Sequence, residues 1–257
     1  MQKFDKLRYI PPIEADASQQ MAIDETLLKM YDEGNTLPTL RFYRFKPSAI
    51  SIGYSQGVKE VIDIETCKKY DIPYIRRVTG GGTVFHDYEG EITYSIITNK
   101  MRGEIEDSFY TLLEPIIEVL KDYGLDAQFK PYNDILVDGR KISGSAQKRG
   151  KKGLLQHGTL MYGTDLDILA DILILDEEKI KQKGADSFFD LVTTMENELG
   201  WKPKPEKLIV EMKNKYKEFF DAEIVESKIS EEEKKNIKNL KDKYNSREWT
   251  FDRKRRM

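Results

Sequence analysis

The sequence predicts an α+β fold. Short apolar segments rich in β-branched and aromatic residues gather before residue 165, whereas segments with helical spacing of apolar residues dominate after it. Strands and helices therefore do not alternate as they do in a parallel βαβ protein. Hydrophobic residues make up 39% of the 257 residues, which is enough for one large core. We expect a single domain over residues 1–250 and a basic tail over residues 251–257.

Each element of the first half follows from its residue pattern. Residues 16–33 place apolar side chains on one helical face, and Gly34 is suited to end that helix. Asp24 falls on the same face, so its carboxylate is either hydrogen-bonded internally or positioned for a neighbouring group. Gly53, near a strand end, indicates close approach of another backbone or of a ligand. The remaining predictions are strands at 39–45 and 49–54 joined by a turn, a helix at 62–70, strands at 72–75 and 91–98, and a helix at 109–123.

A hairpin signal opens the second half. Asp138-Gly139 separates two apolar runs, which predicts a tight turn between strands at 133–137 and 141–143. A further strand is expected at 154–161. Beyond it, the apolar spacing predicts helices at 166–174, 188–199, 205–220 and 230–244.

Composition excludes several classes of function. The net charge of −3 gives no electrostatic argument for nucleic acid as a partner. No apolar run approaches the roughly 18 residues that span a bilayer, and no apolar signal-peptide segment follows the N-terminus. A single cysteine, Cys67, excludes an intrachain disulfide. We therefore expect a soluble cytoplasmic protein that acts neither on nucleic acid nor in a membrane.

The most informative segment is 76–87, in which Arg76 and Arg77 precede three consecutive glycines and His86 follows them. Glycines inside a strand pattern are unfavourable, because they lose conformational entropy and pack nothing. They are best explained where something comes very close to the backbone, and the arginines indicate that it carries negative charge. A flexible turn is the alternative, but the flanking arginines, hydroxyl and histidine favour a ligand-binding loop.

A second candidate segment covers residues 133–147. Its small residues 143–146 leave room for a ligand, and their amides are able to bind an anion. Lys141 lies beside these small residues, where its ammonium group would neutralise a carboxylate or a phosphate. Considered without its neighbours, Lys141 would be interpreted as a solvated lysine of the hairpin. Asn133 and Asp134 offer oxygen ligands suited to Mg²⁺, and a capped turn explains them equally well.

The chain has two histidines, His86 and His157, and neither has a partner at metal-ligand spacing. We therefore expect no zinc site. Each histidine lies beside a glycine-containing segment, which modestly favours a functional role. The P-loop, the Rossmann motif and the serine-hydrolase elbow are absent from the sequence, so a bound nucleotide would need a different architecture.

Together these segments resemble the lipoate-protein ligase A family, which belongs with the biotin protein ligases and the lipoyl and octanoyl transferases. Residues 76–87 match the family's Arg-Arg-x-[Ser/Thr]-Gly-Gly-Gly-x-Val-x-His-Asp loop. Residues 133–134 and 141–146 match its Asn-Asp and Lys-[Ile/Val]-x-Gly-Ser-Ala segments, and residues 157–160 match its His-Gly-[Thr/Ser]-Leu strand. The likeness extends over about residues 15–250, and the triple glycine combined with the lysine motif makes it specific.

The resemblance implies an α+β catalytic domain with a mixed, largely antiparallel β-sheet flanked by helices. It also implies two half-reactions that use ATP and Mg²⁺. The carboxylate of lipoate first attacks the α-phosphate of ATP and gives lipoyl-AMP and pyrophosphate. A lysine amine of an acceptor, either the lipoyl domain of a 2-oxoacid dehydrogenase E2 or the glycine-cleavage H protein, then attacks the mixed anhydride and releases AMP. Fixed cations and backbone amides suit both steps, because negative charge develops at phosphate or carbonyl oxygen.

The resemblance also implies roles for individual residues. Lys141 would be the catalytic residue, acting on the acyl carbonyl and the phosphate, and Asn133 with Asp134 would orient Mg²⁺. The adenylate-binding loop would lie near residues 175–190. The other residues expected to bind lipoate or lipoyl-AMP are Arg77, Thr79, Gly80, Gly81, Gly82, His86, Asp87, Gly144, Ser145, Ala146, His157, Gly158 and Thr159.

Three features depart from the family pattern. Gln20 stands where the family's opening motif has Asn. Residues 183–189 lack the Ser- and Arg-rich character of ligases with a long adenylate loop. The chain ends soon after Trp249, where two-domain ligases continue into an accessory domain, and we therefore expect a separate accessory subunit.

The main alternative is an octanoyltransferase of the same fold, which forms a thioester on a cysteine and needs no ATP. In one such subfamily the cysteine position falls near Asp126 here, and in another it lies downstream of the histidine strand, whereas the only cysteine present is Cys67. Cys67 is better explained as a small core residue. Residues 152–158 nevertheless resemble the transferases as much as the ligases, and an amidotransferase stays open. A biotin ligase is disfavoured because its Gly-Arg-rich signature is absent, and a non-catalytic carrier is disfavoured by Lys141.

Overall fold

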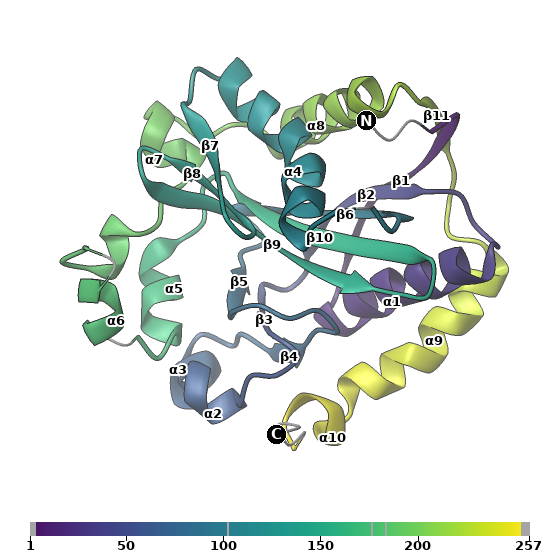
Figure 1. Cartoon of the computed structure of the whole chain (residues 1–257). Coiled ribbons are helices and arrows are strands. Elements are labelled where there is room, and N and C mark those ends of the chain that lie inside the picture. Colours follow the sequence, from purple (N-terminus) through teal and green to yellow (C-terminus); the bar gives the residue numbers. More distant parts are fainter. Residues whose placement is uncertain (1–3, 102, 176, 183, 253–257) are drawn as a thin grey trace.

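The computed structural model describes residues 4–101, 103–175, 177–182 and 184–252, and it shows a layered α+β molecule (Figure 1). Residues 253–257, most of the predicted basic tail, lie outside the described residues, as do the side chains of Glu177 and Lys179. Within the described residues, no helix is long and apolar enough to cross a membrane.

The largest layer is an eight-stranded sheet. Its strands are β1 (Lys6–Ala15), β2 (Thr39–Phe45), β6 (Glu91–Asn99), β7 (Ala127–Lys130), β8 (Asp134–Val137), β9 (Arg140–Arg149), β10 (Gly153–Met161) and β11 (Glu223–Glu226). They follow the order β11-β1-β2-β6-β10-β9-β8-β7. β1 pairs in parallel with both of its neighbours, and every other neighbouring pair is antiparallel.

A three-stranded sheet accompanies the large one. It contains β3 (Ala49–Ile52), β4 (Tyr74–Arg76) and β5 (Val84–His86), with β3 in the middle, parallel to β4 and antiparallel to β5. The predicted α+β class, with a mixed, largely antiparallel sheet flanked by helices, is therefore confirmed.

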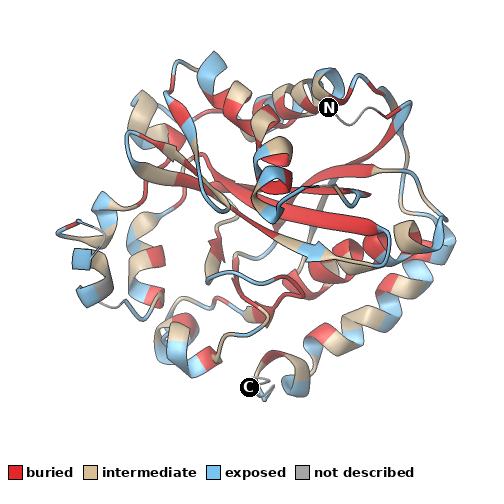
Figure 2. Ribbon diagram, viewed as in Figure 1, coloured by how far each residue is buried: buried red, intermediate tan, exposed pale blue. Residues whose placement is uncertain are grey.

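Helices cover both faces of the large sheet, and its central strands are buried almost throughout (Figures 1 and 2). One core lies between the sheet and α4 (Ile105–Asp122) with α8 (Pro205–Phe220), and the opposite core lies between the sheet and α1 (Ala17–Glu33) with α9 (Glu231–Asn245). The other helices are α2 (Val58–Val61), α3 (Ile64–Lys69), α5 (Leu166–Ile172), α6 (Glu177–Gln182), α7 (Met195–Leu199) and α10 (Arg247–Thr250), with a 3₁₀ turn η1 (Phe188–Asp190). α2, α3 and α5 pack with the small sheet in a third apolar cluster, which Phe251 also joins.

Many predicted elements are confirmed with small shifts at their ends. The helix predicted at 205–220 matches α8, and the strand predicted at 39–45 matches β2. Asp138-Gly139 does connect an antiparallel pair, although β9 extends to Arg149, well beyond the predicted end. Asp16 caps α1 by accepting from the Gln19 amide, and Gly34 ends it in the left-handed conformation.

Three expectations are corrected. The strands predicted at 39–45 and 49–54 lie in different sheets, and the second ends at Ile52. Residues 188–199 are not one helix, because the β-branched run 192–194 is extended and Thr194 caps a short α7. The sequence patterns do not predict β1, β7 and β11. The two prolines of β1 disturb its alternation and coincide with a shift in its pairing with β2.

Candidate functional site

The candidate site begins where the large sheet presents polar side chains toward α1. On β6, apolar residues point into the α4 core, so the alternate residues Thr93 and Ser95 point to the α1 side. Arg41, Ser95 and His157 lie opposite one another on β2, β6 and β10. The next row across the same strands is Tyr43, Thr93 and Thr159.

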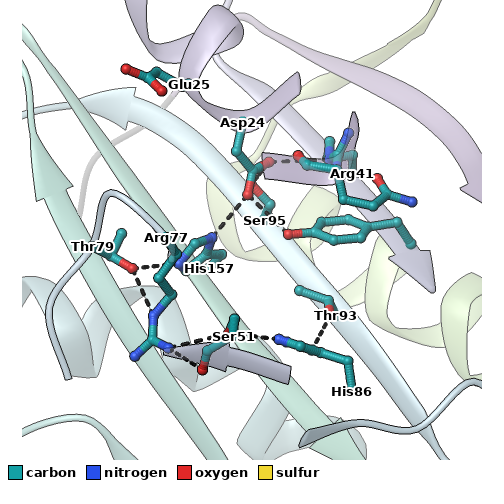
Figure 3. A network of polar contacts seen from close by, with 12 residues as sticks. Asp24, Glu25, Arg41, Ser51, Arg77, Thr79, His86, Thr93, Ser95 and His157 are labelled. Atoms are coloured by element: carbon teal, nitrogen blue, oxygen red, sulfur yellow. Dashed lines mark hydrogen bonds and ion pairs between the residues drawn. The ribbon is translucent and has the colours of Figure 1, made fainter. Parts of the chain in front are cut away.

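Asp24 of α1 lies over these rows and joins them (Figure 3). It is 1% exposed and accepts hydrogen bonds from Tyr43 and Ser95, each at 2.9 Å. Its carboxylate lies 3.2 Å from Arg41 Nε and 2.9 Å from His157 Nδ1. Burial alone would raise the pKa of Asp24, but the Arg41 charge and the hydrogen bonds outweigh it and lower the pKa, so the carboxyl is ionised. The carboxylate predicted on the apolar face is thus bonded internally.

Gln20, the departure from the family motif, belongs to the same buried layer. Its side-chain amide donates to the Ile13 and Arg44 carbonyls, and its oxygen accepts from Arg41 at 2.7 Å. It therefore ties α1 to β1 and β2 and holds Arg41 in position.

The glycine loop lies across this network from Asp24. Gly81 has φ of 88°, a conformation that favours glycine. A Cβ on Gly53 would fall 2.0 Å from the Gly81 carbonyl oxygen, so the close approach predicted at Gly53 is to another backbone, that of the loop itself. Arg77 donates to the carbonyls of Gly80 and Gly82 at 2.7 and 2.6 Å and thereby fixes the loop from within.

The two arginines bond to the protein's own groups. Arg76 donates to the carbonyls of Gly53, Gln56 and Thr250, among others. Arg77 donates through Nε to Thr79 and through one terminal nitrogen to Ser51 (Figure 3). Its other terminal nitrogen donates to the loop carbonyls. Burial lowers the pKa of Arg77 to about 10, which leaves it charged at neutral pH. The expectation that the arginine pair binds an anion directly therefore finds no support in this geometry; the pair shapes the loop.

His86 contacts Ser51, whose hydroxyl also accepts from Arg77. Its Nε2 is 2.9 Å from Ser51 Oγ, and its Nδ1 is 3.1 Å from Glu91. Burial, together with the charge of Arg77, lowers the pKa of His86 well below its usual value, and burial raises that of Glu91 well above its usual value. His86 is therefore neutral at pH 7 and contributes polarity without charge.

Lys141 occupies the opposite wall on β9. Its Nζ lies 2.8 Å from Asp134 Oδ1, and both side chains are partly exposed. Gly144 makes room for it, because a Cβ there would fall 2.5 Å from Nζ. Lys141 thus brings a partly exposed ammonium group to this site.

Two adjoining cavities meet at Lys141. A narrow one of about 60 Å³ collects most of the predicted residues, and a larger one of about 450 Å³ is mainly apolar. Lys141, Gly144 and Thr159 line both. The predicted residues around the narrow cavity are Arg77, Gly81, Gly82, His86, Asn133, Lys141, Gly144, Ser145, Ala146, His157, Gly158 and Thr159.

The described residues of segment 174–193, which leave out Asp176 and Lys183, supply one wall of the larger cavity. Leu175, Ile180 and Phe188 line it, which places the predicted adenylate loop beside Lys141. The segment is also joined to Lys141 directly: the Lys141 amide donates to Leu191 O, and the Thr193 amide donates to Lys141 O, each at 2.9 Å.

Four predicted residues lie elsewhere. Thr79 is buried behind the glycine loop and bonds His157, and Gly80 accepts from Arg77 at its margin. Asp87 accepts from the Glu89 and Asp165 amides in a turn, outside both cavities. Asp134 lines only the larger cavity.

The predicted Mg²⁺ ligands are engaged with protein groups. Asp134 pairs with Lys141, and the Asn133 amide donates to Ser145 O. Among the described residues there is no group of three or more His, Cys, Asp or Glu able to hold a metal ion. One carboxylate already paired with an ammonium does not make a resident Mg²⁺ site, and the metal prediction is unsupported.

Residue patterns alone missed part of the cavity wall: Met21, Tyr43, Ser51, Thr83, Val84 and Thr93. The signal that would have found Tyr43 and Thr93 is strand alternation, since Tyr43 shares a face of β2 with Arg41, and Thr93 shares a face of β6 with Ser95. Ser51 carries no comparable signal, because its role depends on how the small sheet meets the large one.

Cys67, the only cysteine, is 2% exposed within the apolar cluster of the small sheet and lines neither cavity. Burial raises the pKa of its thiol to about 11. It is therefore a core residue, inert as a nucleophile at neutral pH.

Comparison with known proteins places this geometry in a family. A sequence model described as the lipoyl protein ligase A/B catalytic domain matches residues 16–217. The octanoyltransferase LipM of Halalkalibacterium halodurans is 30% identical over 95% of this chain and 98% of the relative. That of Bacillus subtilis is 30% identical over 98% of this chain and 100% of the relative.

Solved structures give a second comparison. A bi-partite lipoate protein ligase of Thermoplasma acidophilum, studied with its E2 lipoyl domain, superposes with a TM-score of 0.84 at 29% identity and covers 95% of this chain and 96% of its own. A lipoate-protein ligase A bound with ATP gives 0.82 at 26% identity over 96% of this chain and 98% of its own. The named sequence relatives are thus octanoyltransferases, whereas these structural neighbours are ligases.

Proposed function

The chain belongs to the lipoyl protein ligase A/B catalytic domain family, and from that premise we propose that it attaches a lipoyl or octanoyl group to a lysine of a lipoyl-acceptor domain. An enzyme of the lipoate ligase and transferase superfamily can obtain an activated acyl group in two ways. It either adenylates the free acid with ATP, or it takes the acyl group from a thioester onto its own cysteine. We propose the first route for this chain.

The position of Cys67 carries this choice. A thioester route needs a thiol within reach of Lys141, and the chain's only thiol is buried in another apolar cluster. Its raised pKa leaves almost no thiolate near pH 7. Neither of the positions at which the transferases carry their cysteine is a cysteine here.

The two cavities suit adenylation. The acyl chain would lie along the loop beside Gly81 and Gly82, with its carboxylate at Lys141, and the nucleotide would enter the larger cavity. The carboxylate attacks the α-phosphorus, the bond to the β-phosphate breaks, and pyrophosphate leaves. Lys141 would neutralise the charge that develops, and Asp134 would hold its ammonium in place before the substrate arrives. The acceptor amine then attacks the carbonyl, loses a proton and releases AMP.

ATP-independent transfer is the second candidate. It is favoured by the named relatives, which are octanoyltransferases at about the same length as this chain. Those names support this candidate better than they support a ligase. It requires that another group of the protein replaces the missing thiol.

The test measures pyrophosphate release by the purified chain with ATP, Mg²⁺ and lipoate or octanoate, without acceptor. On the adenylation route, release needs both ATP and acid and falls about a hundredfold or more in Lys141→Ala. The matched control is Cys67→Ala, which should release pyrophosphate like the parent because Cys67 lies outside both cavities.

A transfer assay separates the second candidate. Octanoyl transfer from a carrier-protein thioester to a lipoyl domain in the absence of ATP would support it. Loss of that transfer in Cys67→Ala would overturn the observation on which the first route rests. If neither reaction occurs, synthetic lipoyl-AMP distinguishes a defect in activation from a defect in transfer.

The partners follow the same proposal. An E2 lipoyl domain accompanies the Thermoplasma ligase, which supports a lipoyl domain as acceptor here. That ligase is bi-partite, which supports a second polypeptide that completes the activity of this chain. Pyrophosphate release by this chain alone at the rate of ordinary ligases would argue against the second polypeptide.

A further inference from the structure

Asp24 lies behind the cavity and lines neither of its parts, yet it is the centre of the buried network. An ionised carboxylate only accepts hydrogen bonds. Its contact with His157 Nδ1 at 2.9 Å therefore requires a hydrogen on that nitrogen. Asp24 thus determines which nitrogen of His157 carries the proton.

The other side of His157 contacts Thr79, with Nε2 and the hydroxyl oxygen 2.8 Å apart. Thr79 already accepts from Arg77 Nε at 3.0 Å. A hydroxyl has one hydrogen to donate, and His157 Nε2 is the acceptor placed for it. The arrangement that gives both groups a partner has a hydrogen on Nδ1 of His157 and leaves Nε2 to accept from Thr79.

This arrangement fixes Arg77. A guanidinium has five N–H donors, and here the acceptors are Thr79, the Ser51 carbonyl and hydroxyl, and the carbonyls of Gly80 and Gly82. No carboxylate is among them. Since Thr79 orients the plane of the guanidinium, it also sets where the two loop carbonyls are held.

We propose that Asp24 is a positioning residue that sets the conformation of the glycine loop through His157, Thr79 and Arg77 (Figure 3). The proposal rests on the proposed function in one respect, namely that the acyl group binds along that loop. Its structural content is independent of the reaction: a carboxylate on α1 orders a loop that follows β4, through one histidine of defined tautomer.

The first experiment is NMR of the full chain labelled with ¹⁵N-histidine. The chain has two histidines, so only two imidazole patterns appear, and a His157→Gln variant assigns them. We expect a hydrogen on Nδ1 of His157 and none on Nε2. A hydrogen on Nε2 alone, or on both nitrogens, overturns the proposal. No substrate is needed, so this result stands whether or not the proposed function is correct.

The second experiment compares Thr79→Val with Thr79→Ser. Valine keeps the shape and removes the hydroxyl, whereas serine keeps the hydroxyl. We expect amide hydrogen exchange in the loop, measured at the Tyr54 amide that donates to Thr79 O at 2.9 Å, to accelerate about tenfold in Thr79→Val, because a buried hydrogen bond that orders the loop is lost. In Thr79→Ser exchange should stay close to that of the parent. Equal acceleration in both variants, or none in Thr79→Val, overturns the proposal.

Asp24→Asn then tests the connection to α1. It should accelerate exchange in the loop, and combining it with Thr79→Val should add nothing further. The matched control is Ser95→Ala, which removes a donor to the other carboxylate oxygen and should leave loop exchange unchanged. Additive effects of Asp24→Asn and Thr79→Val would overturn the connection. If Asp24→Asn does not fold, the proposal is still tested by the tautomer of His157 and by the comparison of Thr79→Val with Thr79→Ser.

Discussion

At the scale of single residues, Gly144 determines where the Lys141 ammonium lies. Its missing side chain leaves the space that Nζ and Cε occupy, and from there Nζ pairs with Asp134. The sequence motif showed small residues beside a lysine, and the structure gives the reason: the space is filled by the lysine itself.

We predict that Gly144→Ala displaces Lys141 without unfolding the protein. The added Cβ would lie 2.5 Å from Nζ, the end of a flexible side chain that is able to move away. Activity should fall about tenfold or more, because the cation leaves its position, while the melting temperature changes little. Acyl activation assays and thermal melts measure the two effects.

Lys148→Ala is the control for this prediction, since Lys148 is an exposed lysine on the same strand. It should keep the activity of the parent. A Gly144→Ala variant with unchanged activity would show that the observed position of Nζ is not needed.

At the scale of elements, the segment that follows α6 is coupled to β9. Residues 191–193 pair in parallel with the backbone of Lys141, and residues just before them line the larger cavity. A ligand in that cavity therefore contacts a wall that is attached to the backbone of Lys141.

We predict that ATP together with the acyl acid slows tryptic cleavage after Lys181 on α6 severalfold. Lys181 is exposed, and Ile180 beside it lines the cavity, so a bound nucleotide would order this segment. Mass spectrometry of the fragments over time measures the rate.

Cleavage after Lys235 provides the internal control, because Lys235 is an exposed lysine on α9, far along the chain from the cavity. Its rate should not change. Equal protection at both sites would indicate general stabilisation and contradict a local effect on α6.

At the scale of the whole molecule, Arg8 joins the two ends of the chain. Its guanidinium pairs with Glu233 of α9, with Nη2 and Oε2 2.9 Å apart, and it also donates to Ser227 and Thr36. Burial would raise the pKa of Glu233, but the Arg8 and Ser230 hydrogen bonds lower it overall. This pair holds α9 against β1, and α9 in turn packs on α1, which carries Asp24.

We predict that Glu233→Gln lowers the free energy of unfolding by about 3 kcal/mol at pH 7, because a buried cation loses its partner. A lowered carboxyl pKa contributes stability above the unfolded-state pKa and loses it as the pH falls through the folded-state value. The difference between parent and variant should therefore shrink as the pH falls below the usual Glu value of 4.5. Urea unfolding at several pH values measures it.

Lys234, the residue after Glu233, forms an exposed pair with Glu231, and Lys234→Ala should change the stability by less than about 0.5 kcal/mol. A comparable loss in both variants would mean that burial of the Arg8 pair is not what matters.

The sequence by itself determined the fold class, most long elements and twelve of the eighteen residues around the narrow cavity. These features depend on residues that lie close together in the sequence. The glycine run, the small residues after Lys141 and the Asp138-Gly139 turn can each be recognised within a few residues. The helix with strong apolar spacing, α8, was placed to the residue for the same reason.

Only the tertiary structure decided what the charged residues do. Arg76 and Arg77 turn inward to carbonyls, Asn133 turns to Ser145, and Asp24 meets His157 across a separation of more than a hundred residues. Hydrogen-bond partners of this kind depend on register between strands and on which helix covers which face. Neither the register of the strands nor the helix that covers a face can be predicted from a short stretch of sequence. The sequence therefore identified residues of the site, and the packing of α1 on the sheet determined their contacts.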